Sequence, residues 1–125
     1  MNLVIIGCLP VDTEARIRAF FPPDWRVVFA GPDLAGSCLR DAEALIPEHL
    51  PINAALLDRA PKLRMIQTGA GYDNVDLAEC TRRGILVCSA AGVNATAVAE
   101  HTMALILGWY KSIVYLDTFL KAHRD

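Results

Sequence analysis

Two loops in this chain combine residues that suit the binding of a small anion. The first is Gly69-Ala70-Gly71, which directly follows an apolar segment, and the second contains Asn94, just before a long helical segment. Two glycines leave backbone amides open to a carboxylate, and an asparagine carboxamide can donate to an oxygen of the same ligand. The alternatives are a tight turn that needs glycine with positive φ, and an Asx-turn or helix cap at Asn94.

The Gly-x-Gly pattern at 69–71 also begins like the phosphate loop of a dinucleotide-binding fold. Such a loop needs a third glycine at position 74, where this chain has Asn74. It also needs an acidic residue after the next strand, where this chain has Cys88-Ser89. We therefore reject a nucleotide-binding loop at this position.

Few other residues are candidates for chemistry. Asp73 and Asp76 are close enough in sequence to suggest a metal pair, but turn and N-cap roles are commoner for such residues. Glu100 and His101 are adjacent in a helical segment, so they do not share a helix face and do not predict a catalytic pair. The sequence thus predicts no metal site and no catalytic side chain.

Five short apolar segments alternate with helical segments. The expected strands are Leu3–Ile6, Arg26–Ala30, Ala44–Ile46, Leu63–Gln67 and Ile85–Cys88. The expected helices are Glu14–Phe21 with Asp12 or Thr13 as N-cap, part of Leu34–Glu43, Asn53–Arg59, Asp76–Arg83 ended by Gly84, and a long helix from Thr96. This alternation predicts an α/β fold, a flavodoxin-like doubly wound parallel sheet of five strands in the order 2-1-3-4-5. Ligands of such sheets bind beyond the carboxyl ends of the strands, where both loops described above fall.

Residues 1–95 form the expected flavodoxin-like domain, and residues 96–125 the long helix. Apolar residues occur nearly all round this helix, because Met103 and Ile106 fall on other faces than Val98 and Leu105. A helix of this kind is buried or covered by a partner. About 25 residues span roughly 37 Å, more than one small domain covers. We infer a further domain, a second subunit, or both.

Composition excludes several classes of function. The chain has 125 residues and a net charge of −2, and without a basic patch we expect no nucleic-acid partner. The apolar N-terminal run has no basic region before it, and charges lie close to Met103–Leu107, so we expect no signal peptide and no membrane span. Four cysteines without zinc spacing or a secretion signal predict a reducing, cytoplasmic location, with Cys8 and Cys88 as small core residues.

Several linked motifs resemble those of the D-isomer-specific 2-hydroxyacid dehydrogenases. They are Gln67–Val75 (QTGAGYDNV), Asp76-Leu77, Arg83–Val87 (RGILV), Gly92-Val93-Asn94 and Ala97–His101 (AVAEH). The resemblance is strong over residues 60–110 and compatible in pattern from residue 1. In that family this region is most of the substrate-binding, or catalytic, domain, which has a flavodoxin-like fold. One departure is Ala91, where the family often has proline.

The resemblance implies roles for particular residues. The implied substrate-binding residues are Gly69, Ala70, Gly71 and Asn94, and the implied cofactor-binding residues are Val98 and Thr102. In the family, backbone amides of the loop hold the substrate carboxylate, the asparagine faces the substrate in several members, and the two helix residues lie near the nicotinamide. The long helix connects two domains and contributes to dimerisation, which implies a homodimer through residues 96–120.

The family chain continues into a Rossmann domain that carries the GxGxxG loop, the residue that selects NAD or NADP, an arginine and a Glu–His pair. These features are missing from the 125 residues, and His101 is not the catalytic histidine. We therefore expect the substrate-binding domain of an enzyme that transfers hydride between NAD or NADP and a small 2-keto or 2-hydroxy acid, inactive by itself. The alternative is a standalone flavodoxin-like module that binds a carboxylate or oligomerises without catalysis.

Overall fold

The structure, a computed structural model, describes residues 1–7, 9–31, 38–48 and 50–123. It divides into two compact units, Met1–Ala91 and Gly92–Asp125, which are treated separately below. Two predictions lie outside the described residues, namely Cys8 as a core residue and the first part of the helix expected within Leu34–Glu43. The described part of that segment, residues 38–41, forms a turn.

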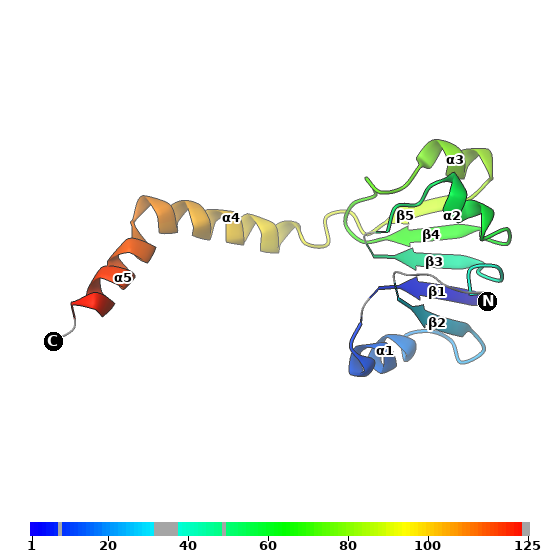
Figure 1. The fold of residues 1–125 in the computed structure, drawn as a ribbon, viewed down its shortest axis with the longest axis horizontal. Helices are drawn as coiled ribbons and strands as arrows, with labels where there is room; N and C mark the ends of the chain where they lie inside the picture. Colours follow the sequence, from blue (N-terminus) through cyan, green and yellow to red (C-terminus); the bar gives the residue numbers. More distant parts are fainter. Residues whose placement is uncertain (8, 32–37, 49, 124–125) are drawn as a thin grey trace. The chain divides into compact units, whose positions relative to one another are not determined.

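All five strands of the first unit lie parallel in one sheet (Figure 1). They are β1 (Asn2–Ile6), β2 (Arg26–Ala30), β3 (Ala44–Pro47), β4 (Met65–Thr68) and β5 (Leu86–Ser89). Their order is β2-β1-β3-β4-β5, which confirms the predicted topology. Because the strands are parallel, the loops that follow them meet at one edge of the sheet, where ligands of such folds bind.

Different helices pack on the two faces of the sheet. Side chains alternate along each strand, so β1 sends Leu3 and Ile5 to one face and Val4 and Ile6 to the other. The first face packs against α1 (Val11–Arg18). The second holds the larger cluster, to which α2 (Ala54–Asp58) and α3 (Leu77–Arg82) contribute.

Two helix starts agree with the sequence. Asn53 Oδ1 accepts a hydrogen bond from the amide of Leu56 at 3.1 Å, and Asp76 Oδ1 accepts one from the amide of Glu79 at 2.9 Å. Both are N-cap bonds, which satisfy amides that have no partner within the helix. Gly84 follows α3 with a φ of +69°, the left-handed conformation that favours glycine after a helix.

The start of α1 differs from the prediction. We expected a helix from Glu14 with Asp12 or Thr13 as its cap, but α1 begins at Val11, with Pro10 at the N-cap position and no side-chain cap. The carbonyl of Pro10 accepts from the amides of Thr13 and Glu14. The fixed φ of proline, here −60°, lets the chain enter the helix without a capping side chain.

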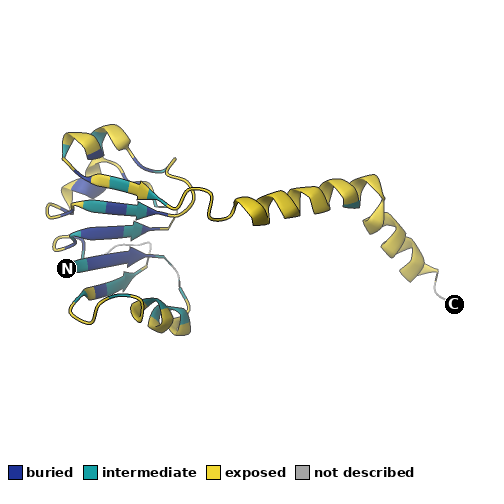
Figure 2. Ribbon diagram, turned by 180° about the vertical axis from the view of Figure 1, so that it is seen from behind, coloured by how far each residue is buried: buried dark blue, intermediate teal, exposed yellow. Residues whose placement is uncertain are grey.

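The second unit is a pair of helices in which no described residue is buried (Figure 2). α4 (Ala95–Tyr110) and α5 (Ile113–Ala122) meet at 55°, and the break falls at Ser112, whose φ of 53° and ψ of 34° are left-handed. The long helix expected from Thr96 is therefore divided in two. In the described part of the chain no single helix is long and apolar enough to cross a membrane; only the bent pair together has that length and composition.

Cys88 is exposed, so the prediction that it is a core residue was wrong. It lies in β5, an edge strand, on the face opposite to Val87, which packs against the larger cluster. Among the described residues, Cys38 and Cys80 are the other free cysteines, and burial raises the pKa of the Cys80 thiol.

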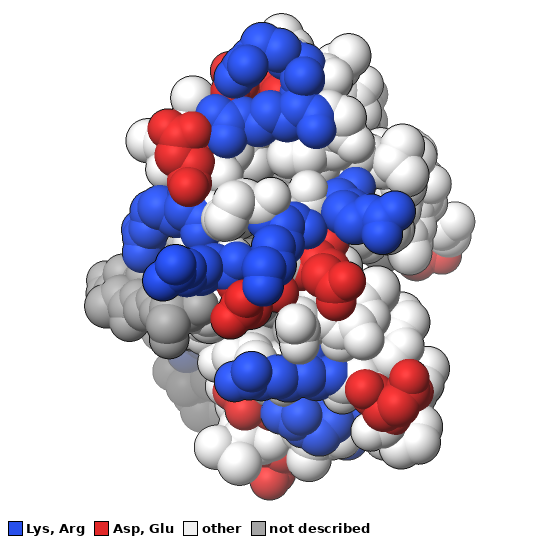
Figure 3. Space-filling view, turned by 90° about the vertical axis from the view of Figure 1, so that its right-hand side faces the viewer, with Lys and Arg blue, Asp and Glu red and all other residues white. Residues whose placement is uncertain are grey.

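Basic and acidic side chains alternate at the amino-terminal edge of the sheet (Figure 3). Lys62 Nζ lies 2.6 Å from Asp41 Oδ1, and Arg83 Nη2 lies 2.7 Å from Asp58 Oδ1. Hydrogen bonding from Lys62 lowers the pKa of Asp41. Acidic partners thus neutralise two of the basic side chains at this edge.

Candidate functional site

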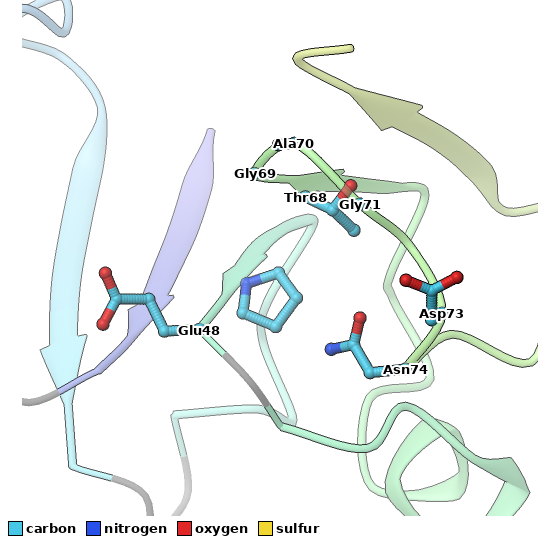
Figure 4. Close-up of a pocket in the computed structure, with 8 residues that line it drawn as sticks. Glu48, Thr68, Gly69, Ala70, Gly71, Asp73 and Asn74 are labelled. Carbon is cyan, nitrogen blue, oxygen red and sulfur yellow. The ribbon is translucent and has the colours of Figure 1, made fainter. Parts of the chain in front are cut away.

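A cavity of about 490 Å³ lies at the carboxyl ends of β3 and β4 (Figure 4). The residues that line it are Pro47, Glu48, Thr68, Gly69, Ala70, Gly71, Asp73 and Asn74. The structure thus brings together three residues predicted for substrate binding and the loop after β3. Its volume suits a small organic ligand.

Both ends of the glycine loop are fixed by hydrogen bonds. At its start, the buried Thr68 donates through Oγ1 to the carbonyl of Cys88 at 3.2 Å, and the amide of Ala90 donates to the carbonyl of Gly69 at 2.8 Å. At its end, Asn74 Nδ2 donates to the carbonyl of Leu50 at 2.7 Å. The loop is therefore held between β5 and the segment after β3.

Sequence reasoning did not assign Thr68 and Asn74 to the site. The available signal for Thr68 was a polar residue at the end of an apolar strand. At Asn74 the sequence shows that the third glycine of a nucleotide loop is absent, and the structure shows that the Asn74 carboxamide fixes the loop.

The amides of Gly69, Ala70 and Gly71 donate no hydrogen bond within the described part of the chain. These residues are exposed, so water or a ligand supplies the acceptors. Such N–H groups are available to donate to an anion. Anion binding by this loop stays a prediction from the sequence.

The backbone conformation does not explain why positions 69 and 71 are occupied by glycine. The glycines with positive φ in the described chain are Gly84 and Gly92, so neither Gly69 nor Gly71 is in the left-handed turn that was the alternative. A Cβ added at Gly69 would meet no atom within 4 Å, and one at Gly71 would lie 3.2 Å from Asp73 Oδ2. The physical role left for Gly69 is to keep the backbone accessible.

Among the described residues that line the cavity, two are acidic and none is Lys or Arg. The side chain of Glu48 extends away from the glycine loop (Figure 4) and lies close to Gly7, where an added Cβ would be 2.6 Å from Glu48 Oε2. The Asp73 carboxylate lies beside Gly71. The Asp73 carboxylate would repel an anion held by the loop amides.

The remaining predicted site residues belong to the second unit. Asn94 is the N-cap residue of α4, yet its side chain makes no cap hydrogen bond, so its carboxamide is not used as the alternative reading expected. The amide of Val98 donates to the carbonyl of Asn94 at 2.9 Å, and Thr102 Oγ1 donates to the carbonyl of Val98 at 2.7 Å. The spacing of four residues places all three on one side of α4.

The other candidate residues are helix caps or exposed side chains. Asp76 is the N-cap of α3, and Glu100 and His101 are exposed on α4. Within the residues that the structure describes, no three His, Cys, Asp or Glu side chains are placed to hold a metal ion.

Comparison with known proteins places this geometry in a family. The model of the D-isomer specific 2-hydroxyacid dehydrogenase catalytic domain matches residues 32–119. Glyoxylate/hydroxypyruvate reductase B of Yersinia enterocolitica is 34% identical over 97% of this chain and 38% of its own length. Glyoxylate reductase of Thermococcus litoralis is 42% identical over 67% of this chain and 26% of its own length.

Solved structures share the fold. The 2-hydroxyacid dehydrogenase of Ketogulonicigenium vulgare Y25 is 25% identical, with a TM-score of 0.77 over 97% of this chain and 39% of that protein. D-Lactate dehydrogenase from Aquifex aeolicus, complexed with NAD and lactic acid, has a TM-score of 0.81 over 99% of this chain and 39% of that protein. At 24% identity, the second likeness shows the fold alone.

The sheet order and the cavity at the carboxyl ends define a flavodoxin-like α/β domain. With the matches above, the chain belongs to the D-isomer specific 2-hydroxyacid dehydrogenase family, as a catalytic domain. It spans less than half the length of the curated relatives it matches.

Proposed function

We propose that this chain forms the substrate-binding side of an NAD(P)-dependent dehydrogenase that transfers hydride between the nicotinamide and a 2-keto or 2-hydroxy acid. The observation that carries the proposal is the run of unpaired amides at Gly69–Gly71 beside a cavity of about 490 Å³. Fixed N–H donors stabilise negative charge without reorganising when a ligand binds. A carboxylate is the anion that every 2-hydroxy acid presents.

The other predicted residues complete the proposed site. Asn94 orients the substrate through its free carboxamide, and Val98 and Thr102 border the nicotinamide from the same side of α4. NAD or NADP would be bound mainly by a second domain. Relatives support this chemistry, since a glyoxylate/hydroxypyruvate reductase from Sinorhizobium meliloti was solved with NADP and malonate.

The charges around the cavity favour a small substrate with one negative charge. Glu48 and Asp73 line the cavity and no described lining residue is basic. A second acidic group on the substrate, such as a phosphate, would meet these carboxylates without a compensating cation. We therefore propose that glyoxylate or hydroxypyruvate fits this site better than a phosphorylated acid.

Titration of the isotope-labelled chain with oxamate, an unreactive analogue of 2-keto acids, tests the site. We expect the amide resonances of Gly69, Ala70 and Gly71 to shift, while that of Gly31, at the end of β2 and away from the cavity, stays unchanged. Because no described lining residue is Lys or Arg, we expect weak binding and would use millimolar ligand. A folded chain whose loop amides do not respond would overturn the proposal.

We also propose that the chain alone is inactive. The sequence has no GxGxxG cofactor loop, and the described cavity lining contains no histidine, lysine or arginine to supply a proton or positive charge to a bound keto acid. Incubation with glyoxylate and NADH should give no oxidation of NADH above the blank. Turnover by the 125-residue chain would contradict this.

The helix pair is proposed to connect two domains and to form a homodimer through residues 96–120, with residues 1–95 as the substrate-binding domain. Large apolar side chains are exposed along both helices, among them Leu105, Trp109 and Ile113. The free cysteines Cys38 and Cys80 suit the proposed cytoplasmic location. The same exposed surface favours the second candidate, a standalone oligomerisation module. A GxGxxG motif in the downstream reading frame would support the dehydrogenase, and a stop codon the module.

A further inference from the structure

Glu48 lines the cavity and carries a carboxylate that has no partner within the described part of the chain. The residue follows β3, and its backbone amide donates to the carbonyl of Ile6 at 2.9 Å, which continues the pairing of β3 with β1 by one residue. Among the described residues, none donates a hydrogen bond to its carboxylate or pairs with it as a cation. The Glu48 carboxylate is therefore available to accept a hydrogen bond from a ligand.

The position of this carboxylate depends on Gly7, which follows β1. A Cβ added at Gly7 would lie 2.6 Å from Glu48 Oε2, closer than real Cβ atoms approach another atom. Positive φ does not account for this glycine, because the glycines with positive φ in the described chain are Gly84 and Gly92. Gly7 therefore provides room for the Glu48 carboxylate at the end of β1.

The glycine loop and the Glu48 carboxylate lie on opposite sides of β3. The loop follows β4 and Gly7 follows β1, and these two strands are the neighbours of β3 in the sheet. The Glu48 side chain extends from the end of β3 toward Gly7, away from Gly69, Ala70 and Gly71 (Figure 4). Ligands of such sheets bind where the strand order reverses, and in this order that point lies between β1 and β3.

We propose that Glu48 selects 2-keto and 2-hydroxy acids that carry a hydrogen-bond donor, a hydroxyl or an ammonium group, on their third carbon. This inference rests on the proposed function, in which the amides of Gly69–Gly71 hold the substrate carboxylate. The Glu48 carboxylate accepts a hydrogen bond from the group on the third carbon, whereas a methyl group there leaves the carboxylate without a partner. Hydrogen bonds to a charged acceptor are stronger than those between neutral groups, so this contact discriminates between the two kinds of acid.

The distance across β3 suits an acid of three carbons. Strands that are two apart in a sheet are separated by about 10 Å, and the ends of β1 and β4 have this relation. Hydrogen bonds of about 2.9 Å at the two ends leave roughly 4 Å for the ligand itself. A three-carbon acid spans this length from a carboxylate oxygen to an oxygen or nitrogen on its third carbon. Glyoxylate has no third carbon, so it contacts the glycine loop alone.

Binding of three stable acids to the 125-residue chain tests the role of Glu48. The D isomers of lactate, glycerate and isoserine carry a methyl, a hydroxyl and an ammonium group on the third carbon and are otherwise alike. We would titrate each acid into the isotope-labelled chain and follow the amide resonances of Gly69, Ala70 and Gly71. Glycerate or isoserine should bind at least about tenfold more tightly than lactate, and the tighter of the two identifies the donor group.

Two variants separate the charge of Glu48 from its position. Glu48→Ala should abolish the preference over lactate, while the affinity for lactate stays the same or rises because a repelling charge is lost. Gly7→Ala should weaken the preference although the charge remains, since the new Cβ displaces Glu48 Oε2. Asp24→Ala is the control and should keep the preference, because Asp24 precedes β2 and does not line the cavity. The amide spectrum of each variant shows whether it is folded.

The possible outcomes distinguish the role of Glu48 from the proposed function. Equal affinities of the wild-type chain for the three acids would overturn the role of Glu48 and keep the function, because the loop would still bind a carboxylate. A preference that survives Glu48→Ala would have the same consequence. A preference that survives Gly7→Ala would overturn the position assigned to the carboxylate. If no acid shifts the loop amides of the folded chain, the proposed function fails, and the role of Glu48 fails with it.

Discussion

Both units carry large apolar side chains, but many of those in the first unit are buried, whereas those in the second unit are exposed. In the first unit, strands and helices bury Leu45 completely, whereas in the second unit Leu105 is 61% exposed. A sheet can cover its apolar residues with the helices that connect its own strands. A pair of helices that is apolar nearly all round cannot, so its stability in the whole protein depends on what packs against it.

The largest effect expected from this contrast is on folding. Leu45→Ala should destabilise the first unit by about 2–5 kcal/mol, because it removes a buried side chain and leaves a cavity. The matched change Leu105→Ala should alter the free energy of unfolding of the monomer by no more than about 0.5 kcal/mol. Urea unfolding followed by circular dichroism measures both. Similar losses for the two variants would show that the helix pair is already packed in the monomer.

The next effect concerns association. If the helix pair is a dimerisation surface, Ile106→Asp should raise the dissociation constant of the dimer at least about tenfold, since it places a charge in an apolar interface. Phe20→Asp is the control, because Phe20 is equally apolar and 86% exposed but belongs to the first unit. Sedimentation velocity over a range of concentrations gives the dissociation constants. A wild-type chain that stays monomeric at high concentration would contradict the homodimer.

The contrast between the two units also shows which structural features the sequence could predict. The sequence predicts strand β2 and the caps Asn53 and Asp76 because short apolar segments and capping residues act locally. The break at Ser112 was not, because neither glycine nor proline marks it and the backbone alone adopts the left-handed conformation. Exposure of Cys88 depends on its strand being at the sheet edge and on the absence of cover, which a single apolar segment does not reveal.

The sequence predicts the position of the candidate site, but it does not reveal which side chains hold the glycine loop in place. The sequence locates the glycine loop because two glycines after an apolar strand leave backbone amides open, and the structure places the loop on the cavity. The side chains that hold it, Thr68 and Asn74, act on carbonyls of segments remote in sequence. These contacts join segments that are 20 and 24 residues apart in the sequence, so no local pattern marks them.

A more modest effect tests the glycine loop itself. Gly69→Ala should leave the fold intact, since the new Cβ meets no atom within 4 Å, but it should weaken oxamate binding about tenfold by crowding the approach to the amides. Gly31→Ala is the matched control, because no atom of the described residues lies within 4 Å of its added Cβ and Gly31 does not line the cavity. Titration by nuclear magnetic resonance gives both affinities. Equal affinities for the two variants would argue against the loop as the carboxylate site.

The smallest effect is the pH dependence of a charge cluster in the first unit. Hydrogen bonds from Arg82 and then Arg83 hold the pKa of the Glu79 carboxyl at about 2, below its ordinary value of 4.5. The cluster therefore stabilises the fold fully above pH 4.5, and this contribution is lost as the pH falls from 4.5 toward 2. Glu79→Gln should flatten the stability curve in that window.

The helix pair supplies the control for this prediction. Asp117 forms an exposed pair with Lys121 at 2.7 Å, and no second cation joins it in the described chain. Exposed single pairs contribute little to stability, so Asp117→Asn should leave the acid limb of the unfolding curve unchanged. If Glu79→Gln and Asp117→Asn changed the acid limb of the unfolding curve equally, the cluster of Glu79 with two arginines would behave as an ordinary surface pair. The two units would then not differ in the contribution of their charged pairs to stability.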